Sequence, residues 1–369
     1  MKPICAAPFI GFHWKGNQSE DTSTMGSYFT CCETHDTRGI HFKPNTPFEE
    51  VFNNNYAKQI RQELLDGKWP RQCQSCKNIL DTTGFDRRET YNKLATEDIE
   101  WNVEKGNGMK WIDIRPSNLC NQKCRMCSSF NSSLIAAEEK TLGIKVSNSY
   151  LFKKSSFDFV EHIPFQEMEF VKILGGEPLV QKETKDIISR VKDDCVVMIT
   201  TNGNKPHADI LSTALESKSK VIFNVSVDGV GKTYEYIRTN GRWNETKKFV
   251  ESLPKEKINN VSMVPSLWNA FVLKDWFEWT EELGVKRFFH YTFQDWLSLS
   301  LLDEEDKFEI YQQLHQYPDF ERMKHQMLKT PVNREELLQR FTMETRHLDK
   351  VRGTNILDLD PRFEKYLHD

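Results

Sequence analysis

The sequence of 369 residues contains no uninterrupted apolar run near the roughly 18 residues of a membrane span. Its start lacks the charged region and the long apolar stretch of a secretion signal. An excess of one charge is also lacking, because 50 Lys and Arg against 54 Asp and Glu leave a formal net charge of −4. No global basic field therefore favours nucleic acid or an anionic membrane. We expect a soluble, cytoplasmic protein with no membrane partner and no strong nucleic-acid signal.

The chain does contain nine cysteines, which is many for a cytosolic protein. In a reducing compartment structural disulfides are disfavoured, and clustered cysteines more often bind metal or do redox chemistry. We interpret Cys195, which stands alone before an apolar run, as a small buried apolar residue. The other cysteines form a tight central group and a dispersed upstream group: Cys120, Cys124 and Cys127, and Cys5, Cys31, Cys32, Cys73 and Cys76.

From about Met109 the sequence alternates short apolar runs with longer amphipathic ones, which is typical of βα units and a mainly parallel sheet. The short runs are rich in β-branched and aromatic residues and end in polar or turn residues. They predict six strands, at 110–116, 169–176, 196–203, 220–229, 259–267 and 285–293. The segments between them predict helices at 132–143, 182–194, 207–217, 244–253 and 273–283.

The predicted fold class is α/β, with three parts. Six βα units favour a curved, partly open (β/α)6 barrel at 106–300 over a closed eight-fold one, with its chemistry at the carboxyl ends of the strands. Residues 1–105 show no such alternation and predict a small metal-stapled α+β domain with a helix within 48–67. Residues 301–369 predict a charged, helical C-terminal extension.

The segment CNQKCRMC places Cys120, Cys124 and Cys127 directly after the first predicted strand. Thiolates at this spacing can converge on one iron–sulfur cluster, at the strand end where a barrel carries its chemistry. From spacing alone the alternatives are a zinc knuckle without its fourth ligand and a group of free thiols. The segment is therefore a candidate metal site.

The order of four motifs resembles that of the radical S-adenosylmethionine (radical SAM) superfamily over roughly 109–295. CNQKCRMC follows the first predicted strand, GGEP ends the second, and TTNG and SVDG end the third and fourth. The resemblance implies a [4Fe–4S] cluster held by the three cysteines, with S-adenosylmethionine on the remaining iron. It further implies that an electron from a donor such as flavodoxin or ferredoxin cleaves S-adenosylmethionine to a 5′-deoxyadenosyl radical, which abstracts a substrate hydrogen.

The resemblance also implies which residues contact S-adenosylmethionine. Gly175 and Gly176 carry no side chain, so backbone carbonyls and Glu177 can approach the cationic amino group of the cofactor. An arginine fork at Arg238 suits its methionyl carboxylate. The other expected contacts are Pro178 and Ser226, Thr201 and Asn202 at the ribose, and Met126 and Phe130 near the adenine.

The upstream cysteines form a second candidate metal site. Cys73 and Cys76 are a CxxC chelating pair, while Cys5 and the Cys31–Cys32 doublet come close to them only through folding. Four thiolates suit zinc as well as an iron–sulfur cluster, and spacing does not separate the two. About the first 80 residues resemble the SPASM/twitch auxiliary-cluster domains of radical SAM proteins, here placed before the barrel. The resemblance implies a second [4Fe–4S] cluster on Cys5, Cys31, Cys73 and Cys76, with Cys32 as the alternative to Cys31.

The leading functional hypothesis is a radical SAM oxidoreductase or maturase whose auxiliary cluster accepts an electron from the product radical or holds the substrate. Both a peptide or protein substrate and a sugar or other small molecule stay open. The alternative from another class is a zinc-stapled, non-catalytic module that binds protein or RNA. Candidate substrate contacts lie at the ends of the first and sixth predicted strands: Arg115, Thr292, Gln294, Asp295 and Trp296.

Overall fold

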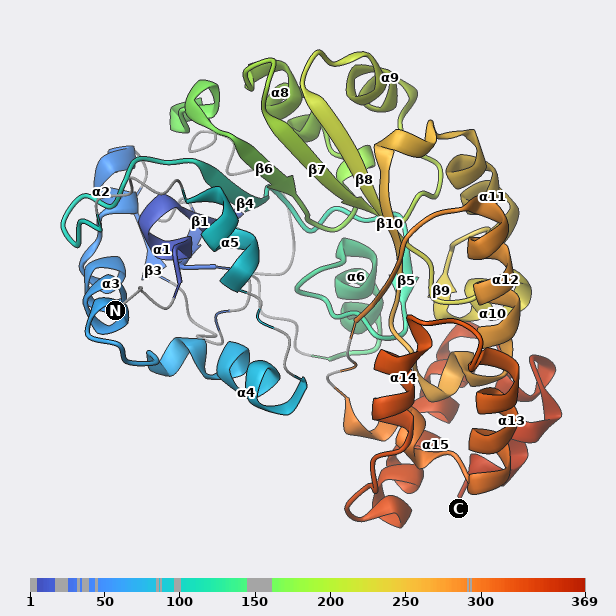
Figure 1. The fold of residues 1–369 in the computed structure, drawn as a ribbon. Coiled ribbons are helices and arrows are strands. Elements are labelled where there is room, and N and C mark those ends of the chain that lie inside the picture. Colours follow the sequence, from blue (N-terminus) through green and yellow to red (C-terminus); the bar gives the residue numbers. More distant parts are fainter. Residues whose placement is uncertain are drawn as a thin grey trace. The chain divides into compact units, whose positions relative to one another are not determined.

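The computed structural model describes residues 5–16, 26–31, 34, 40–43, 46–83, 86, 88–95, 101–144, 161–290, 292 and 294–368 (Figure 1). The chain divides into two compact units and passes between them several times. The first unit comprises Met1–Cys120, Ser128–Thr200 and Pro206–Ile222, and the second comprises Asn121–Cys127, Thr201–Lys205 and Phe223–Asp369. No helix within the described ranges is long and apolar enough to cross a membrane.

The sheet of the first unit has the strand order β7-β6-β4-β1-β2-β3. Its parallel part consists of β1 (Gly11–Gly16), β4 (Trp111–Arg115), β6 (Phe170–Ile173) and β7 (Val196–Thr201), whose last residue belongs to the second unit. Beyond β1 the sheet continues with two antiparallel strands, β2 (Gly26–Phe29) and β3 (Ile40–His41).

Strand β1 extends the parallel sheet into the N-terminal region, where the sequence predicts no βα alternation. The sequence nevertheless carries a signal for this strand, because buried Phe12 and Trp14 alternate with His13 and Lys15. The alternation covers only one short segment, and the helix that follows it in a βα unit is replaced here by the antiparallel strand β2.

Helices cover one face of the parallel strands in the first unit. α8 (Lys182–Arg190) and α9 (Ala208–Glu216) pack against each other beside β6 and β7 (Figure 1). α6 (Ser133–Thr141) begins where the Ser132 side chain accepts a hydrogen bond from the backbone N–H of Ile135. Short 3-10 helices complete the connections: η1 (Arg71–Cys73), η3 (Phe165–Glu167) and η4 (Pro178–Val180).

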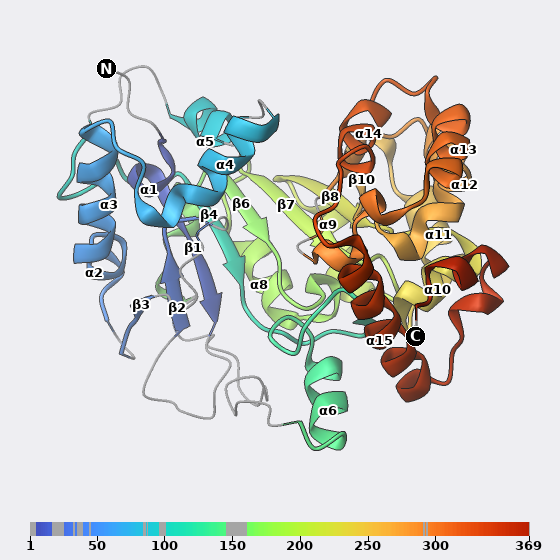
Figure 2. The ribbon, with the colours of Figure 1, turned by 90° about the horizontal axis from the view of Figure 1, so that it is seen from below.

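The N-terminal helices pack onto the beginning of β4 (Figure 2). The shared core contains Phe9 and Ile10 of α1, Ile60 and Leu64 of α3, and Trp111 at the start of β4. The Nε1–H of Trp111 donates to a backbone carbonyl of α1 at 3.3 Å. The helices of this region are α1 (Ala7–Ile10), α2 (Phe48–Phe52), α3 (Asn55–Leu65), α4 (Gln74–Thr83) and α5 (Arg88–Leu94).

The second unit contains three parallel strands and most of the C-terminal helices. The strands are β8 (Lys220–Ser226), from its fourth residue onward, β10 (Ile258–Met263) and β11 (Arg287–Phe289), while β5 (Lys123–Cys124) pairs antiparallel with β9 (Arg238–Thr239). The α-helices are α10 (Gly231–Ile237), α11 (Trp243–Ser252), α12 (Leu273–Leu283), α13 (Glu304–Leu314), α14 (Phe320–Met327) and α15 (Arg334–Arg352). The 3-10 helices are η5 (Lys255–Lys257), η6 (Leu267–Val272), η7 (Asp295–Leu297), η8 (Leu299–Leu301), η9 (Ile356–Asp358) and η10 (Pro361–Tyr366).

The predicted α/β class with a mostly parallel sheet is confirmed. The six predicted strands overlap β4, β6, β7, β8, β10 and β11, of which β10 begins one residue before its predicted range. The five predicted helices coincide with α6, α8, α9, α11 and α12 to within a few residues. The helix predicted within 48–67 is interrupted, because α2 ends at Phe52 with Asn53 as its C-cap and Asn54 then caps the start of α3. The (β/α)6 barrel and the domain limits 1–105, 106–300 and 301–369 stay predictions.

Candidate functional site

The segment that leads from β4 to Cys120 is held by the GGEP segment after β6. The backbone N–H of Gly176 donates to Ser117 O at 3.0 Å, and the N–H of Glu177 donates to Leu119 O at 2.8 Å. The backbone N–H of Cys120 donates to a serine hydroxyl at the start of α6, at 3.2 Å. The segment before the first cysteine and the N–H of that cysteine are therefore fixed by hydrogen bonds within the first unit.

Gly176 approaches this segment so closely that no side chain fits. A Cβ atom on Gly176 would lie 2.3 Å from Leu119 O and 2.5 Å from Asn118 O. Gly175 adopts a φ of +153°, and its Cβ would lie 2.8 Å from Ser117 O. The resemblance of the GGEP motif implies that these glycines make room for a cofactor. The structure shows that they make room for the backbone that carries the first cysteine.

Glu177 and Pro178 begin the 3-10 helix η4. The Glu177 side chain is 1% exposed and accepts a hydrogen bond from the backbone N–H of Leu179 at 2.9 Å. Pro178 occupies the first position of η4. A backbone N–H at this position has no partner within the helix, so the missing N–H of proline costs no hydrogen bond. The carboxylate of Glu177 therefore caps η4 in this structure.

Cys124 and Cys127 lie in one turn of the second unit. The backbone N–H of Cys127 donates to Cys124 O at 3.0 Å, and Cys124 is paired with Arg238 across β5 and β9. Cys124 is half-buried, whereas Cys127 is exposed. Burial raises the pKa of the Cys124 thiol to about 12, and the guanidinium of Arg238, whose Nη1 lies 3.8 Å from Cys124 Sγ, acts in the opposite direction.

Arg238 forms an ion pair with Asp228 of the SVDG motif, at 2.7 Å between Nη2 and Oδ2. Burial lowers the pKa of Arg238, but the carboxylate of Asp228 outweighs it and raises that pKa above its ordinary value. The Nε of Arg238 is buried and has no hydrogen-bond partner within the described part of the chain. The guanidinium expected at a methionyl carboxylate therefore has a carboxylate partner in the protein and one donor left over.

The TTNG motif holds the residue that follows Cys120. Asn202 Nδ2 donates to Asn121 Oδ1 at 2.8 Å, and Asn121 Nδ2 donates to Asn204 O at 2.6 Å. The hydroxyl of Thr201 accepts a hydrogen bond from the backbone N–H of Gly203, at 3.0 Å. Thr201 and Asn202, which the sequence analysis expects at a ribose, are thus 2% and 6% exposed and engaged within the protein.

The remaining expected cofactor contacts are distributed over the two units. In the second unit Ser226 is the last residue of β8, where the Ser262 hydroxyl approaches its hydroxyl at 3.5 Å, and Met126 lies half-buried in the cysteine turn. In the first unit the ring of Phe130 lies under the ammonium group of Lys15, at 4.4 Å.

Of the candidate substrate contacts, Trp296 packs into the core of the second unit, where its ring contacts Trp268 at 5.6 Å between centroids. Asp295 is exposed on η7, and the Thr292 hydroxyl lies 3.2 Å from Gln294 Oε1. In the first unit Arg115 is half-buried at the end of β4.

Arg125, which no sequence motif indicates, makes several contacts from the three-cysteine loop, residues 120–127. Its guanidinium donates to Tyr236 O at 2.9 Å, to Asp349 at 2.7 Å and to Thr354 at 2.6 Å. It also lies over the Tyr236 ring, at 3.5 Å from the centroid. Arg352 Nη1 donates to a carbonyl of the same loop at 2.8 Å. No local sequence pattern could reveal these contacts, because their partners lie more than 100 residues away.

Three of the upstream cysteines share one electrostatic neighbourhood in the first unit. Burial raises the pKa of Cys5 to about 12, and Cys73 and Cys76 raise it further. Burial also raises the pKa of Cys73 to about 12, with Cys76 as the next contribution. Cys31 packs against the same apolar core as Cys5. Cys32, the alternative ligand, lies outside the described residues.

The thiols of both groups fit an iron–sulfur cluster by their chemistry. Every described cysteine is a free thiol, and Cys195, predicted to be a small buried apolar residue, is 0% exposed. Within the described ranges no three His, Cys, Asp or Glu side chains meet closely enough to hold a single metal ion. Soft thiolates select iron–sulfur clusters or zinc, and the unsatisfied Nε of Arg238 adds a donor suited to an anionic cofactor group.

Comparisons with known proteins give a curated relative, solved structures and a family model. The curated probable GTP 3′,8-cyclase of Methanocaldococcus jannaschii is 27% identical over 193 residues, which are 49% of this chain and 58% of that relative. The chain thus spans little more than half of the relative's length. Streptococcus suis SuiB bound to S-adenosylmethionine gives a TM-score of 0.37 at 14% identity, covering 78% of this chain and 65% of that chain. SuiB bound to the precursor peptide SuiA gives a TM-score of 0.38 at 13% identity, covering 78% of this chain and 66% of that chain.

The strongest assignment comes from the family comparison, in which residues 114–269 match the radical SAM superfamily. The matched range begins within β4 and contains the three-cysteine loop, GGEP, TTNG and SVDG. These are the motifs whose order suggested the superfamily in the sequence. Residues 114–269 are therefore a radical SAM superfamily domain.

Proposed function

We propose that the chain is a radical SAM enzyme in which Cys120, Cys124 and Cys127 hold a [4Fe–4S] cluster and S-adenosylmethionine is cleaved. The observation that carries the proposal is the position of CNQKCRMC, directly after β4 and inside the matched range 114–269. When bound and reduced, such a cluster supplies the electron that cleaves S-adenosylmethionine to a 5′-deoxyadenosyl radical for hydrogen abstraction.

The contribution of the surrounding residues is to hold the thiols of the loop. Gly176 and Glu177 fix the backbone before Cys120, and Asn202 fixes the residue after it. The Arg238 guanidinium lies beside Cys124 Sγ and favours its thiolate form, which is the form that binds iron. The residues of GGEP, TTNG and SVDG thus support the ligands of the proposed cluster.

Residues of these motifs and of the loop are also the proposed contacts of S-adenosylmethionine, because they lie close in sequence to the three cysteines or to the end of a strand. Arg238 Nε is the donor that remains without a partner in the described residues. The other proposed contacts are Gly175, Gly176, Glu177, Pro178, Thr201, Asn202, Ser226, Met126 and Phe130.

A second [4Fe–4S] cluster on Cys5, Cys31, Cys73 and Cys76 is proposed for the N-terminal region. Two observations support it: Cys73 and Cys76 each raise the pKa of Cys5, and Cys31 packs against the same apolar core as Cys5. Its role would be to accept an electron from the product radical or to hold the substrate. The resemblance of this region to a twitch domain stays a prediction.

The substrate and the electron donor belong to the proposal as well. The curated relative is a probable GTP 3′,8-cyclase, which supports a small-molecule substrate, while a peptide substrate stays open. A flavodoxin or a ferredoxin is the proposed donor. The zinc-stapled binding module is not favoured, because it gives no role to a radical SAM domain.

The test of the proposal compares iron content and cofactor cleavage in anaerobically purified protein. Cys120, Cys124 and Cys127 replaced together by Ala should remove about four irons per chain and abolish dithionite-driven formation of 5′-deoxyadenosine. Cys195→Ala is the matched control, because it also removes a buried thiol but should leave both quantities unchanged. Full iron content and continued cleavage in the triple variant would overturn the assignment of the three ligands.

A further inference from the structure

A row of charged and polar side chains crosses three neighbouring parallel strands of the first unit. His13 on β1 is the cross-strand partner of Asp113 on β4, and Asp113 is the partner of Lys172 on β6. Two residues further along, Lys15 on β1 is the partner of Arg115 on β4. Because side chains two residues apart on a strand share a face, all five lie on one face of the sheet, which we call the charged face.

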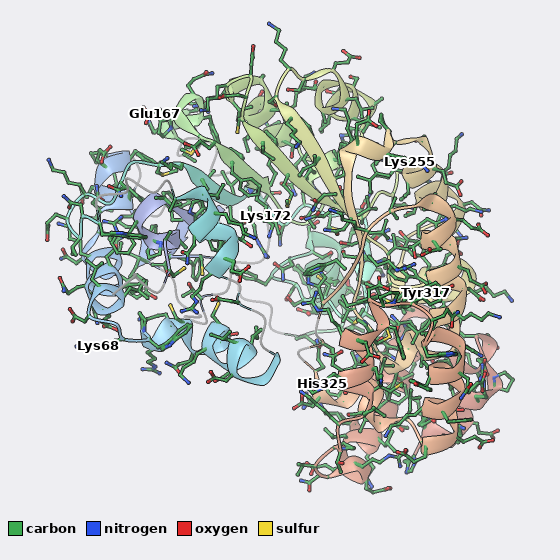
Figure 3. The ribbon with its side chains drawn as sticks, in the orientation of Figure 1. Lys68, Glu167, Lys172, Lys255, Tyr317 and His325 are labelled. Atoms are coloured by element: carbon green, nitrogen blue, oxygen red, sulfur yellow. The ribbon has the colours of Figure 1, made fainter. Side chains whose placement is uncertain are left out.

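The carboxylate of Asp113 joins its two neighbours on the charged face. His13 Nδ1 lies 2.9 Å from Asp113 Oδ1, and Lys172 Nζ lies 3.7 Å from Asp113 Oδ2. The Asp113 side chain is 1% exposed, whereas the side chain of Lys172, labelled on β6 in Figure 3, is 27% exposed. Asp113 therefore holds the Lys172 ammonium group at a position that a ligand can reach.

The opposite face of the same strands is entirely different. Ile112 and Ile114 on β4 and Val171 and Ile173 on β6 are all fully buried. Parallel strands covered by packed elements on both faces are normally apolar on both. Burying charges costs free energy that an ion pair does not reliably recover. The ion pairs of the charged face are therefore weak evidence for a stabilising role.

A comparison with Arg61 shows how a structural cation of this unit is satisfied. The fully buried Arg61 donates to three backbone carbonyls and to Asn53 Oδ1, at 2.7 to 3.1 Å. Arg115 donates from Nη1 to Asn131 Oδ1 at 2.8 Å, but its Nε is buried without a hydrogen-bond partner among the residues that the structure describes. Arg115 thus retains a donor that the protein does not use.

The charged face carries a net positive charge. Among the residues that the structure describes on this face, Lys15, Arg115 and Lys172 contribute three positive charges and Asp113 contributes one negative charge. Burial lowers the pKa of His13 to about 4, so its imidazole is neutral at pH 7. The face therefore attracts anions, and β4 leads from it directly toward Cys120.

We propose that the charged face binds an anionic group of the substrate, a carboxylate or a phosphate, through Arg115 and Lys172. The Arg115 guanidinium supplies directional N–H donors for the oxygens of that group, and Lys172 adds a point charge. Asp113 acts as a positioning residue for Lys172. The inference rests on the proposed function, because it identifies the chemistry of the substrate that the radical SAM domain acts on.

The test measures anion binding to the anaerobically purified full chain by calorimetry, at constant ionic strength. Inorganic phosphate and acetate are the two probes, and they distinguish a phosphorylated substrate from a carboxylic acid. Lys172→Met and Arg115→Met should each weaken binding of the preferred anion at least about tenfold, because each removes a charge-assisted contact. If Lys172→Met fails to fold, Lys172→Arg is tested in its place. It keeps the positive charge and should retain anion binding.

The matched control is Lys185→Met on α8, because Lys185 is an exposed lysine of the same unit and should bind the anion as the wild type does. Absence of saturable binding in the wild type, or equal binding in wild type, Lys172→Met and Arg115→Met, overturns the inference. Cleavage of S-adenosylmethionine by the same wild-type preparation reports on the proposed function separately. Cleavage of S-adenosylmethionine without binding of either anion would overturn only the inference. Binding of the anion through Lys172 without cleavage of S-adenosylmethionine would overturn only the proposed function.

Discussion

Arg125 of the three-cysteine loop and Asp349 of helix α15 form an ion pair of 2.7 Å. The Arg125 side chain is fully buried, and the Asp349 side chain is 13% exposed. Asp349 also accepts hydrogen bonds from the Thr354 hydroxyl at 2.8 Å and the Ile356 N–H at 2.9 Å, so it ties the end of α15 to the loop. Residues beyond the matched range 114–269 thereby support the loop that carries the proposed ligands.

The first prediction concerns this ion pair. Asp349→Asn should lower the free energy of unfolding by about 2 to 4 kcal/mol, because it leaves the guanidinium of Arg125 buried without a countercharge. Urea unfolding of the anaerobic protein measures the change. Asp275→Asn, at an exposed position of α12, is the matched control and should change the stability by less than about 0.5 kcal/mol. Equal stability of the two variants would show that the pair contributes nothing to the fold.

The second prediction concerns Gly176. Gly176→Ala should displace the backbone of residues 118–119, because the added Cβ would lie 2.3 Å from Leu119 O. The displaced segment precedes the first proposed ligand, so iron per chain should fall toward the content of the variant that lacks the three loop cysteines. Gly108→Ala is the control for backbone strain without a clash. Gly108 has a φ of +72°, but nothing lies within 4 Å of its Cβ position. An unchanged iron content in Gly176→Ala would mean that the loop adjusts without loss of its ligands.

The third prediction concerns the upstream cysteines. Cys73→Ala combined with Cys76→Ala should lower the iron content by about four per chain. It should also destabilise the N-terminal helices, because a bound cluster would supplement their small core. Formation of 5′-deoxyadenosine should survive, whereas turnover of the substrate should not. Wild-type protein with about eight irons and no zinc fits two clusters, and about four irons with one zinc would assign a purely structural metal to this region.

The fourth prediction is a pH dependence from His13. Burial lowers its pKa from the ordinary 6.5 to about 4, so between these values the unfolded chain binds more protons than the folded chain. The contribution of His13 to stability is therefore complete above about pH 6.5 and is lost as the pH falls toward 4, by about 3 kcal/mol in total. His13→Gln should flatten the stability profile in this window. His207→Gln, at an exposed position before α9, is the matched control for the loss of an imidazole.

Much of the architecture can be read from the sequence because parallel strands and amphipathic helices leave local patterns. Residues 273–283 show this best, since an apolar period that ends before Gly284 predicts α12 with its observed limits. Gly284 adopts a φ of 64°, the left-handed conformation that ends helices and that glycine adopts without strain. The motif order likewise predicts the superfamily of the matched range, because each motif follows directly on a strand.

The contacts of the site are less accessible to such reasoning, because they join residues that are distant in the chain. Nothing near Arg125 indicates that Asp349 neutralises it, and nothing near Gly176 indicates that Leu119 O occupies the space beside it. The charged face cannot be predicted from the sequence for a related reason, since His13 and Asp113 become neighbours only through the pairing of β1 with β4. Spacing identifies the candidate ligands, and only the fold shows what holds them.

The distance along the chain between Arg125 and Asp349 also has a consequence for biosynthesis. Their side chains are 224 residues apart in sequence. At about 5 to 20 residues per second, synthesis delivers α15 roughly 10 to 45 s after the loop. During that interval the loop lacks the carboxylate that neutralises Arg125 and the hydrogen bonds that α15 supplies. We therefore expect iron and sulfur to be incorporated after the C-terminal helix has docked, so that assembly of the cluster follows completion of the fold in time.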